Sequence, residues 1–243
     1  MANKTCRSQA SLQVSDWPPV YTLKRHWRAR HVKMAYSRTH GLQITVPLRF
    51  SAKHLPSIIE ENKDWIIKQK HLHGEIKPVT RPAEITFSAF QQTCSVHYFQ
   101  NDKRPRIKSL DAHGIILSGD IQEMSVCLEK LEAWVKQQAK HLLIPYFREL
   151  SLQMGLPYLD VTVRSQSTLW GSCSQDKSIR LNYKLVFLPE NLLRHIMIHE
   201  LCHTRYMNHS EKFWQLVAHF DDQWIAHRKA IKRADAFIPA WIK

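Results

Sequence analysis

Residues 199–203 read His-Glu-Leu-Cys-His, which puts two histidines four positions apart with a glutamate directly after the first. Residues four apart lie on the same face of an α-helix, so both imidazoles can reach one metal ion at the roughly 2.0–2.1 Å that zinc–nitrogen bonds require. Glu200 then lies beside the ion, where its carboxylate can take a proton from a water molecule. Because the pattern works only on a helix, it constrains the fold more strongly than any other segment.

The surrounding residues predict that helix. Apolar residues recur on one helical face from 192 to 197, and Pro189 suits a first helical turn. We therefore predict a helix over residues 189–204. The alternative is a purely structural amphipathic helix with buried, hydrogen-bonded histidines, but it explains neither Glu200 on an apolar segment nor the histidine at position 209.

His209 is the best candidate for a third metal ligand. It follows His203 by six residues, as in the metzincin pattern, but Tyr206 occupies the position of the metzincin glycine. A gluzincin would take its third ligand from a later helix, where Glu211 is the only glutamate. Asn208 can adopt the left-handed turn that would bring His209 back toward the helix.

A competing ligand pair lies on the same helical face. His195 precedes His199 by four residues, so these two could bind an ion and leave His203 unused. A ligand helix usually contributes one such pair and takes its third ligand from elsewhere, so we expect His195 to pack one turn away. Cys202 is turned away from the ligand face, and we interpret it as a packing residue.

Several motifs in the chain are specific and occur in a fixed order. They are Leu-Trp-Gly-Ser-Cys-Ser at 169–174, Ile-Arg-Leu-Asn at 179–182, the His-Glu-Leu-Cys-His segment, and Asn-His-Ser-Glu-Lys-Phe-Trp at 208–214. Together they resemble the YgjP-like metallopeptidase family, which is related to SprT-like and gluzincin-type minimal zincins. The resemblance also extends to the N-terminal half, from about residue 21 to residue 70.

This resemblance implies zinc ligands at His199, His203 and His209, and a catalytic glutamate at Glu200. It also implies a zincin-like fold for the C-terminal part of the chain. His195 departs from the family pattern, since relatives tend to carry tyrosine there. This departure leaves the identity of the ligands unchanged, but the inner face of the helix must pack differently from that of the relatives.

Composition is that of an ordinary soluble protein, with 44% hydrophobic and 23% charged residues in 243. No apolar run approaches the roughly 18 residues that a membrane span needs, and residues 1–14 lack the apolar stretch of a signal peptide. The five cysteines show no Cys-x-x-Cys spacing, which favours reduced thiols. We therefore expect a cytoplasmic protein with no membrane association.

Positive charge is concentrated in the N-terminal half. Residues 1–110 contain 19 Lys and Arg against 7 Asp and Glu, whereas residues 111–243 contain 16 against 14. Residues 24–33 are the densest stretch and interleave cations with Trp27, a pattern that can bind phosphates and stack on bases. The alternative is a solvent-facing pair of strands with long cationic side chains. An anionic partner, nucleic acid or nucleotide, is the corresponding hypothesis.

Hydrophobic periodicity predicts an α+β protein in which a β-rich N-terminal part packs against a mainly helical, zincin-like part with a short sheet. We place the domain boundary between residues 120 and 121, giving a basic domain at 1–120 and a catalytic domain at 121–243. The predicted strands cover 21–46 (with a hairpin between 32–36 and 42–46), 83–87, 94–99, 106–110, 114–118, 159–166 and 179–183. The predicted helices cover 53–71 (with Trp65 and Ile66 on its buried side), 121–150, 189–204, 210–220 and the region after 224.

The strands before the metal helix suggest how a substrate could bind. Zinc peptidases commonly bind substrate backbone along a sheet edge, which 159–166 or 179–183 could provide. Residues 170–174 either turn toward the metal and shape the cleft, or serve as a core anchor at Trp170 and a tight turn at Gly171. Tyr206 and Arg164 are candidates for a second electrophile.

These observations predict a zinc-dependent hydrolase that cleaves peptide bonds, with Glu200 as general base. Two alternatives remain open. One is a metal-dependent hydrolase of nucleotide phosphoanhydrides, suggested by the basic half but lacking an Asp/Glu cluster for magnesium. The other is a nucleic-acid-associated protease like the SprT-like relatives, although no Cys-x-x-Cys zinc finger supports it. The chain has no G-x-G-x-x-G, Walker A or G-x-S-x-G motif, which excludes dinucleotide, P-loop and serine-hydrolase sites of those types.

Overall fold

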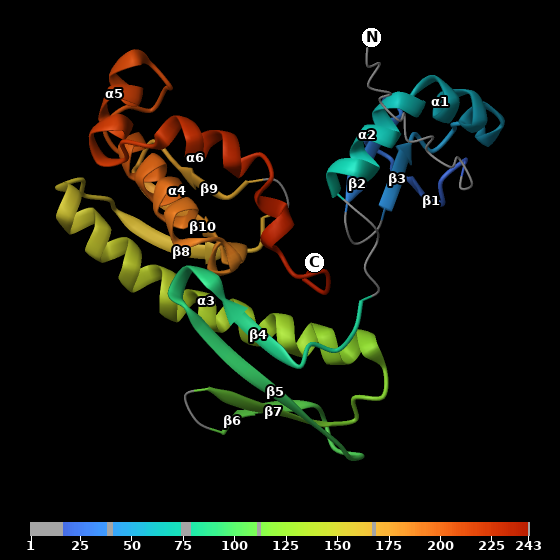
Figure 1. Cartoon of the computed structure of the whole chain (residues 1–243), viewed down its shortest axis with the longest axis horizontal. Coiled ribbons are helices and arrows are strands. Elements are labelled where there is room, and N and C mark those ends of the chain that lie inside the picture. The colour runs from blue at the N-terminus through green and yellow to red at the C-terminus, as the bar shows by residue number, and fades with distance from the viewer. Residues whose placement is uncertain (1–16, 38–40, 74–78, 111–112, 167–168, 243) are drawn as a thin grey trace, which may run out of the picture. The chain divides into compact units, whose positions relative to one another are not determined.

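The structure is a computed structural model that describes residues 17–37, 41–73, 79–110, 113–166 and 169–242. The chain divides into two compact units, residues 1–78 and residues 79–243. Each unit has its own hydrophobic core. The mixture of helices and three small sheets confirms the predicted α+β class (Figure 1).

The first unit is built around a three-stranded sheet in the order β1-β3-β2. These strands are β1 (Tyr21–Arg25), β2 (Lys33–Ser37) and β3 (Gly41–Val46). β2 and β3 pair antiparallel, which confirms the predicted hairpin, although most of its expected turn (38–40) lies outside the described residues. β1 pairs parallel with β3, and the central strand β3 buries Leu42, Ile44 and Val46 completely.

Two helices replace the single helix predicted over residues 53–71. They are α1 (Leu55–Glu61) and α2 (Lys63–His73), preceded by the 3-10 turn η1 (Ala52–His54). The break falls at Asn62, whose side-chain amide donates to the carbonyl of Ile58 at 2.8 Å and so caps the end of α1. Ile66 is buried as predicted, but Trp65 is 37% exposed.

The basic stretch of residues 24–33 lies on the surface of this unit. Trp27 is 69% exposed, and the Arg28 guanidinium lies 4.4 Å from the centre of its ring. Arg25 instead has a structural role, because its side chain donates to the backbone carbonyls of Leu48 and Phe50. Surface exposure is what both the anionic-partner hypothesis and the solvent-face alternative require.

The second unit contains a four-stranded sheet in the order β4-β5-β7-β6, with β5 and β7 parallel and the outer pairs antiparallel. Alternate residues such as Ile115 and Leu117 are buried, as expected for a sheet with one face covered. The four predicted strands of this region are confirmed. They are β4 (Glu84–Phe87), β5 (Gln92–Gln100), β6 (Arg106–Ser109) and β7 (Gly114–Gly119), with the 3-10 turn η2 (Ser88–Phe90) between β4 and β5.

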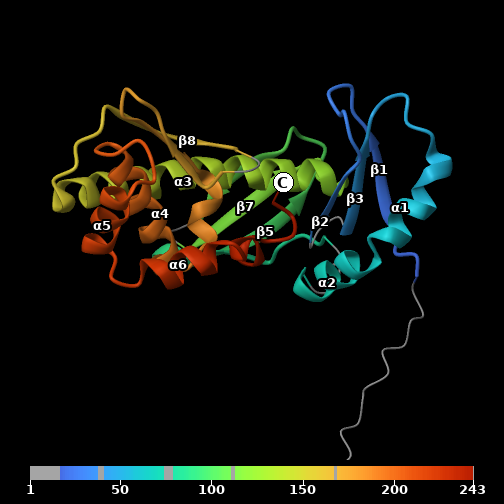
Figure 2. The same ribbon diagram turned by 90° about the horizontal axis from the view of Figure 1, so that it is seen from above.

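A long helix, α3 (Met124–Met154), connects this sheet to the rest of the unit (Figures 1 and 2). Its buried residues recur every three or four positions from Leu128 to Leu150, which forms one apolar stripe. The helix contacts β6 of this sheet and β8 of the second sheet, so a single core spans both. Gly155 ends α3 with a left-handed φ of 63°, a conformation that glycine adopts without strain.

The second sheet has the order β8-β10-β9, and its strand β9 contacts α4, the helix that carries His199 and His203. β10 is its central strand, parallel to β8 and antiparallel to β9. The sequence predicted β8 and β10 but missed the three-residue strand β9. The elements that follow are mainly helical. In chain order, this region comprises β8 (Asp160–Arg164), β9 (Gly171–Cys173), β10 (Ser178–Asn182), η3 (Tyr183–Phe187), α4 (Glu190–His203), α5 (Glu211–Phe220), α6 (Trp224–Ile231) and η4 (Ala234–Phe237).

The structural division after residue 78 differs from the domain boundary expected after residue 120. The reason is the packing of α3, because buried residues of β4–β7 such as Ile85 and Leu117 share one core with Leu131 of that helix. Strand-rich sequence before 120 therefore belongs to the same unit as the helices after it. None of the helices in the described part of the chain combines the length and apolarity that a membrane crossing requires.

Candidate metal centre

The predicted metal helix forms as α4, and it carries His199, Glu200 and His203 on one turn and a half of helix. Pro189 precedes the helix at the N-cap position instead of lying in the first turn. The helix is nearly surrounded by protein, because ten of its residues are buried, including Glu200 and His203. Such burial fixes the side chains on which the chemistry depends.

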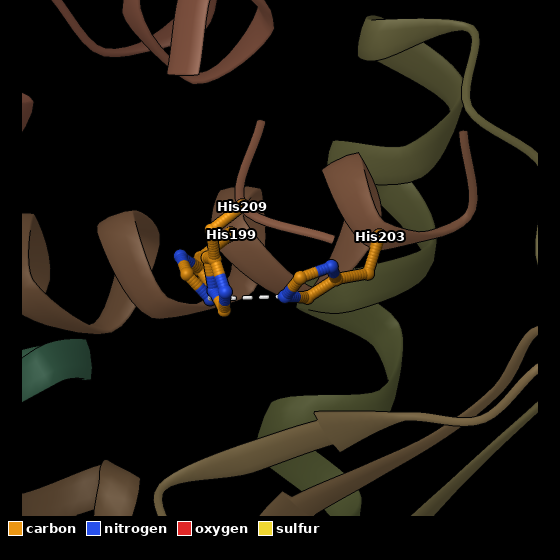
Figure 3. A group of neighbouring side chains, drawn as sticks. All are labelled: His199, His203 and His209. Carbon is orange, nitrogen blue, oxygen red and sulfur yellow. Dashed lines mark hydrogen bonds between the residues drawn. The ribbon is translucent and has the colours of Figure 1, made fainter. Parts of the chain in front are cut away.

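His209 reaches the same point from outside the helix. α4 ends at His203, and the chain reverses before α5 begins after Ser210, the N-cap residue. The Nε2 atom of His199 lies 3.1 Å from Nε2 of His203 and 3.1 Å from Nε2 of His209. Figure 3 shows the three imidazoles converging on one point. The sequence-predicted trio is therefore brought together.

The protonation of His203 can be assigned from its second nitrogen. Its Nδ1 lies 3.0 Å from the backbone carbonyl of Tyr206, which can only accept, so Nδ1 carries the proton. The Nε2 atom that faces His199 therefore presents a lone pair. Donor atoms around a tetrahedral zinc lie about 3.3 Å apart. The observed spacing and donor chemistry fit a shared cation of that kind.

Burial favours the neutral form of the ring nitrogens. It lowers the pKa of His199 to about 3, an effect strengthened by the neighbouring His203 and His209 imidazoles. Burial likewise lowers the pKa of His203. A neutral imidazole keeps the lone pair that a metal ion requires. His199 and His203 can therefore bind a cation at neutral pH without first losing a proton.

The Asn-His-Ser-Glu-Lys-Phe-Trp motif supplies the wall that holds these rings. Phe213 of α5 is fully buried, and its ring centre lies 4.5–4.9 Å from those of the three imidazoles. Trp214 stacks on His209 at 5.5 Å. The motif therefore places a ligand and its two packing partners within seven residues.

Glu200 is held close to the backbone of the edge strand β9. A side-chain carbon added at Gly171 would lie 2.7 Å from Cγ and 2.8 Å from Oε1 of Glu200. Gly171 lies in a strand with ordinary backbone geometry, so its role is close approach and not the tight turn considered from the sequence. Glu200 is only 6% exposed, and burial raises its pKa to about 8.

That pKa shift predicts how stability depends on pH. In metal-free protein, the folded state keeps a proton on Glu200 up to about pH 8, whereas a glutamate in the unfolded chain releases it near 4.5. The folded state therefore binds more protons across this window, and its free energy of unfolding falls as the pH rises from about 4.5 to about 8. We expect the free energy of unfolding to fall more steeply with pH in the wild type than in Glu200→Gln, which has no carboxyl at this position. Urea unfolding with chelator at several pH values would measure it, and parallel pH profiles would contradict it.

A cavity of about 760 Å³ opens onto the three histidines and Glu200. The Trp-Gly-Ser-Cys segment at 170–173 lines it, as in the first of the two alternatives considered for 170–174, although Trp170 also packs against the core, as in the second. Neither Tyr206 nor Arg164, the residues considered as second electrophiles, is among its described lining residues, whereas Arg228 is. Sequence reasoning missed Arg228, which lies over the Trp214 ring at 4.5 Å and has no motif around it.

His195 is not part of the trio. Its Nδ1 lies 2.5 Å from Oδ2 of Asp221, and its ring centre is 6.5 Å from that of His199. The alternative ligand pair of His195 and His199 is therefore not assembled. Cys202 is fully buried and packs in the core, as interpreted from the sequence.

Comparison with known proteins agrees with the motifs. Residues 30–234 match the family described as "YgjP-like, metallopeptidase domain". A solved structure, the metallopeptidase zymogen abylysin of Pyrococcus abyssi, is similar to 37% of this chain and 91% of its own, with 21% identity and a TM-score of 0.34. No curated protein matches the chain. Since the family match spans most of the sequence, the chain belongs to the YgjP-like metallopeptidase family.

Proposed function

We propose that this protein is a zinc-dependent peptidase with His199, His203 and His209 as metal ligands and Glu200 as general base. The observation that carries the proposal is the convergence of three Nε2 atoms beside the Glu200 carboxyl at the wall of one cavity. Three neutral imidazoles with an open fourth position form the donor set of catalytic zinc sites. When bound, zinc would polarise the scissile carbonyl and lower the pKa of a coordinated water to about 7.

Glu200 would move the protons of the reaction. Its carboxylate accepts a proton from the attacking water and returns it to the amine that leaves. A divalent charge beside Glu200 favours the ionised carboxylate and so opposes the effect of burial on its pKa. The close backbone of Gly171 leaves little free space on that side of the Glu200 side chain and so restricts its movement.

The substrate backbone would bind along β9. This strand is an edge of its sheet and lines the cavity with Gly171, Ser172 and Cys173, so its free side can pair with an extended peptide. The central strand β10 has neighbours on both sides and cannot do so. β8, the other edge, contributes none of the described residues that line the cavity. Neither of the two predicted strands is therefore suited to pair with a substrate backbone, and β9, which the sequence did not predict, is the better candidate.

Parallel assays of peptides and nucleotides would test the proposal. Protein stripped with a chelator and reloaded with Zn²⁺ is incubated with a diverse peptide mixture and, separately, with nucleoside triphosphates. We expect peptide cleavage that depends on zinc and disappears in His203→Gln, with triphosphates left intact. Triphosphate hydrolysis without peptide cleavage would instead favour the phosphoanhydride alternative. Wild-type protein that retains no zinc would exclude the zinc peptidase.

A further inference from the structure

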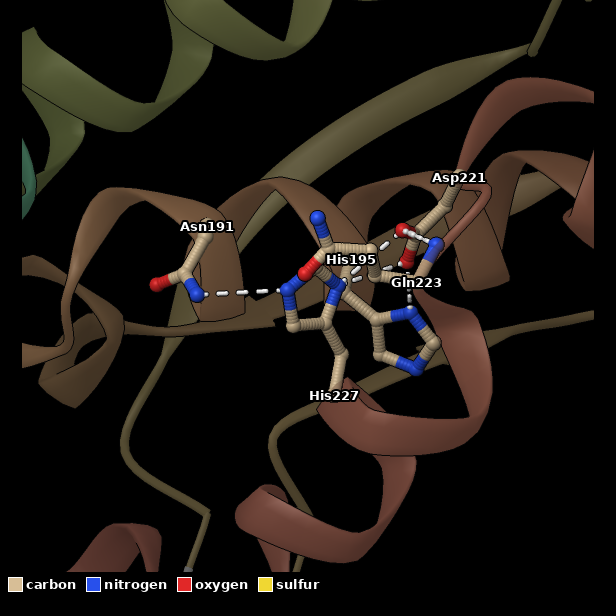
Figure 4. A network of polar contacts seen from close by, with 5 residues as sticks. All are labelled: Asn191, His195, Asp221, Gln223 and His227. Atoms are coloured by element: carbon tan, nitrogen blue, oxygen red, sulfur yellow. Dashed lines mark hydrogen bonds and ion pairs between the residues drawn. The ribbon is translucent and has the colours of Figure 1, made fainter.

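We propose that His195, Asp221 and His227 form a second metal site, separate from the trio at 199, 203 and 209. The three residues come from α4, the end of α5 and α6. Their ligand atoms, the two Nδ1 atoms and a carboxylate oxygen, lie within 4.8 Å of one another. Figure 4 shows both imidazoles directed at the Asp221 carboxylate.

The distances within this group are short on both sides of Asp221. His195 Nδ1 lies 2.5 Å from Oδ2, and His227 Nδ1 lies 3.0 Å from each carboxylate oxygen. These are hydrogen-bond distances, shorter than the spacing of about 3.3 Å between donor atoms around a tetrahedral zinc, so the rings and the carboxylate must move slightly apart when an ion enters. The backbone N–H of Gln223 donates to Oδ1 at 3.1 Å, which fixes the orientation of the carboxylate. Two imidazoles and one carboxylate are a recurrent ligand set for first-row divalent ions such as Zn²⁺.

Burial and charge favour a cation at this position. Asp221 is 8% exposed and His195 is 2% exposed, so a buried carboxylate is held among rings. Within the described residues, the ion-pair partners of Asp221 are the two histidines, and no lysine or arginine forms an ion pair with it. A buried carboxylate is costly unless it is paired with a positive charge or bound to a metal.

A separate cavity gives access and room for further ligands. It measures about 360 Å³ and is lined by His195, Asp221, His227 and a second carboxylate, Asp222. Among the described residues that line it, Arg194 is the only arginine or lysine. Water or Asp222 could therefore complete the coordination that three protein ligands leave open.

Metal binding at this site needs no net gain or loss of protons by the three side chains. Without metal, each Nδ1–H donates to Asp221, and Nε2 of His227 accepts a hydrogen bond from the Asn191 amide at 3.2 Å. With metal, each ring keeps one proton, now on Nε2, and Nδ1 presents its lone pair. Rotation of the Asn191 amide would let its oxygen accept from Nε2–H of His227. Both rings remain neutral, and Asp221 remains ionised.

The two groups do not share a ligand. His199 Nε2 lies 3.1 Å from the Nε2 atoms of His203 and His209, whereas Nδ1 of His195 is engaged with Asp221. The ring centres of these two histidines are 6.5 Å apart. Each group can therefore hold its own ion, and each can be removed without deleting a ligand of the other.

Zinc stoichiometry of the full-length protein tests this. After chelator treatment and dialysis against Zn²⁺, we expect about two bound equivalents in the wild type and about one in Asp221→Asn. His227→Gln should also bind about one, and so should His203→Gln, which deletes a ligand of the trio. His219→Gln, an exposed histidine of α5, is the matched control and should still bind about two. Circular dichroism would establish that each variant is folded.

Equal zinc content in the wild type, Asp221→Asn and His227→Gln would overturn the second site. Failure of the peptidase proposal looks different, because His203→Gln would then bind as much zinc as the wild type. Anomalous scattering at the zinc edge from wild-type crystals gives an independent answer. A peak between His195, Asp221 and His227 supports the proposal, and a single peak at the trio rejects it.

Discussion

Glu200→Gln protein should keep its zinc and lose peptide hydrolysis by about 10²–10⁴-fold, the usual contribution of a general acid–base residue. Glutamine has the shape of glutamate and should fit the same space against Gly171 and the α4 helix. It cannot accept the proton of the attacking water. The three histidines are unchanged, so metal content should match the wild type. Steady-state turnover and metal analysis on the same preparation measure both effects.

The comparison with His203→Gln makes this result interpretable. That variant should lose activity together with zinc, whereas Glu200→Gln should lose activity alone. If Glu200→Gln turned over peptides within a few-fold of the wild type, the carboxylate would have no part in proton transfer. Loss of zinc in Glu200→Gln would instead show that Glu200 supports the metal site.

Gly171→Ala should lower turnover by about 10²-fold through displacement of Glu200, because misplacement of a catalytic group by about 1 Å can cost that much. The added carbon would lie 2.7–2.9 Å from three side-chain atoms of Glu200, closer than packed atoms approach. Either the glutamate or β9 must therefore move. We expect the loss mainly in kcat, with zinc content unchanged, as measured by steady-state kinetics and metal analysis.

Gly155→Ala is the matched control for this substitution. At Gly155 nothing lies within 4 Å of the added carbon, but the backbone has a left-handed φ of 63°. We expect that variant to lose some stability at the end of α3 and to keep its turnover. Equal turnover of Gly171→Ala and the wild type would mean that β9 can yield without moving the catalytic carboxyl.

Local sequence patterns predicted several elements, including the helix that carries two members of the trio. Helix α4 followed from apolar spacing, and the pairing of β2 with β3 followed from a hairpin-like pattern. The same spacing did not show where one helix ends and the next begins. Apolar residues recur at helical spacing on either side of Asn62, whose side-chain amide donates to the Ile58 carbonyl at the point where α1 ends and α2 follows.

Contacts between segments that are far apart in the chain could not be predicted from the sequence. The boundary after residue 120 appeared reasonable because strands give way to helices there, but α3 packs on the preceding sheet and moves the division to residue 78. β9 is too short for a periodic signal, although it forms the edge nearest Glu200. Asp221 and His227 have no motif around them, and their meeting with His195 depends on how three helices pack.

The sequence by itself determined which residues gather at the first site: two histidines and a glutamate close together on one helix, and a third histidine with its aromatic support a few residues later. Those relations are short in sequence, so helical geometry and a single turn suffice to build them. Only the tertiary structure decided which backbone confines Glu200, which strand edge faces the cavity, and which partners His195 has. These depend on packing between segments that are far apart in the chain, and no local spacing encodes them.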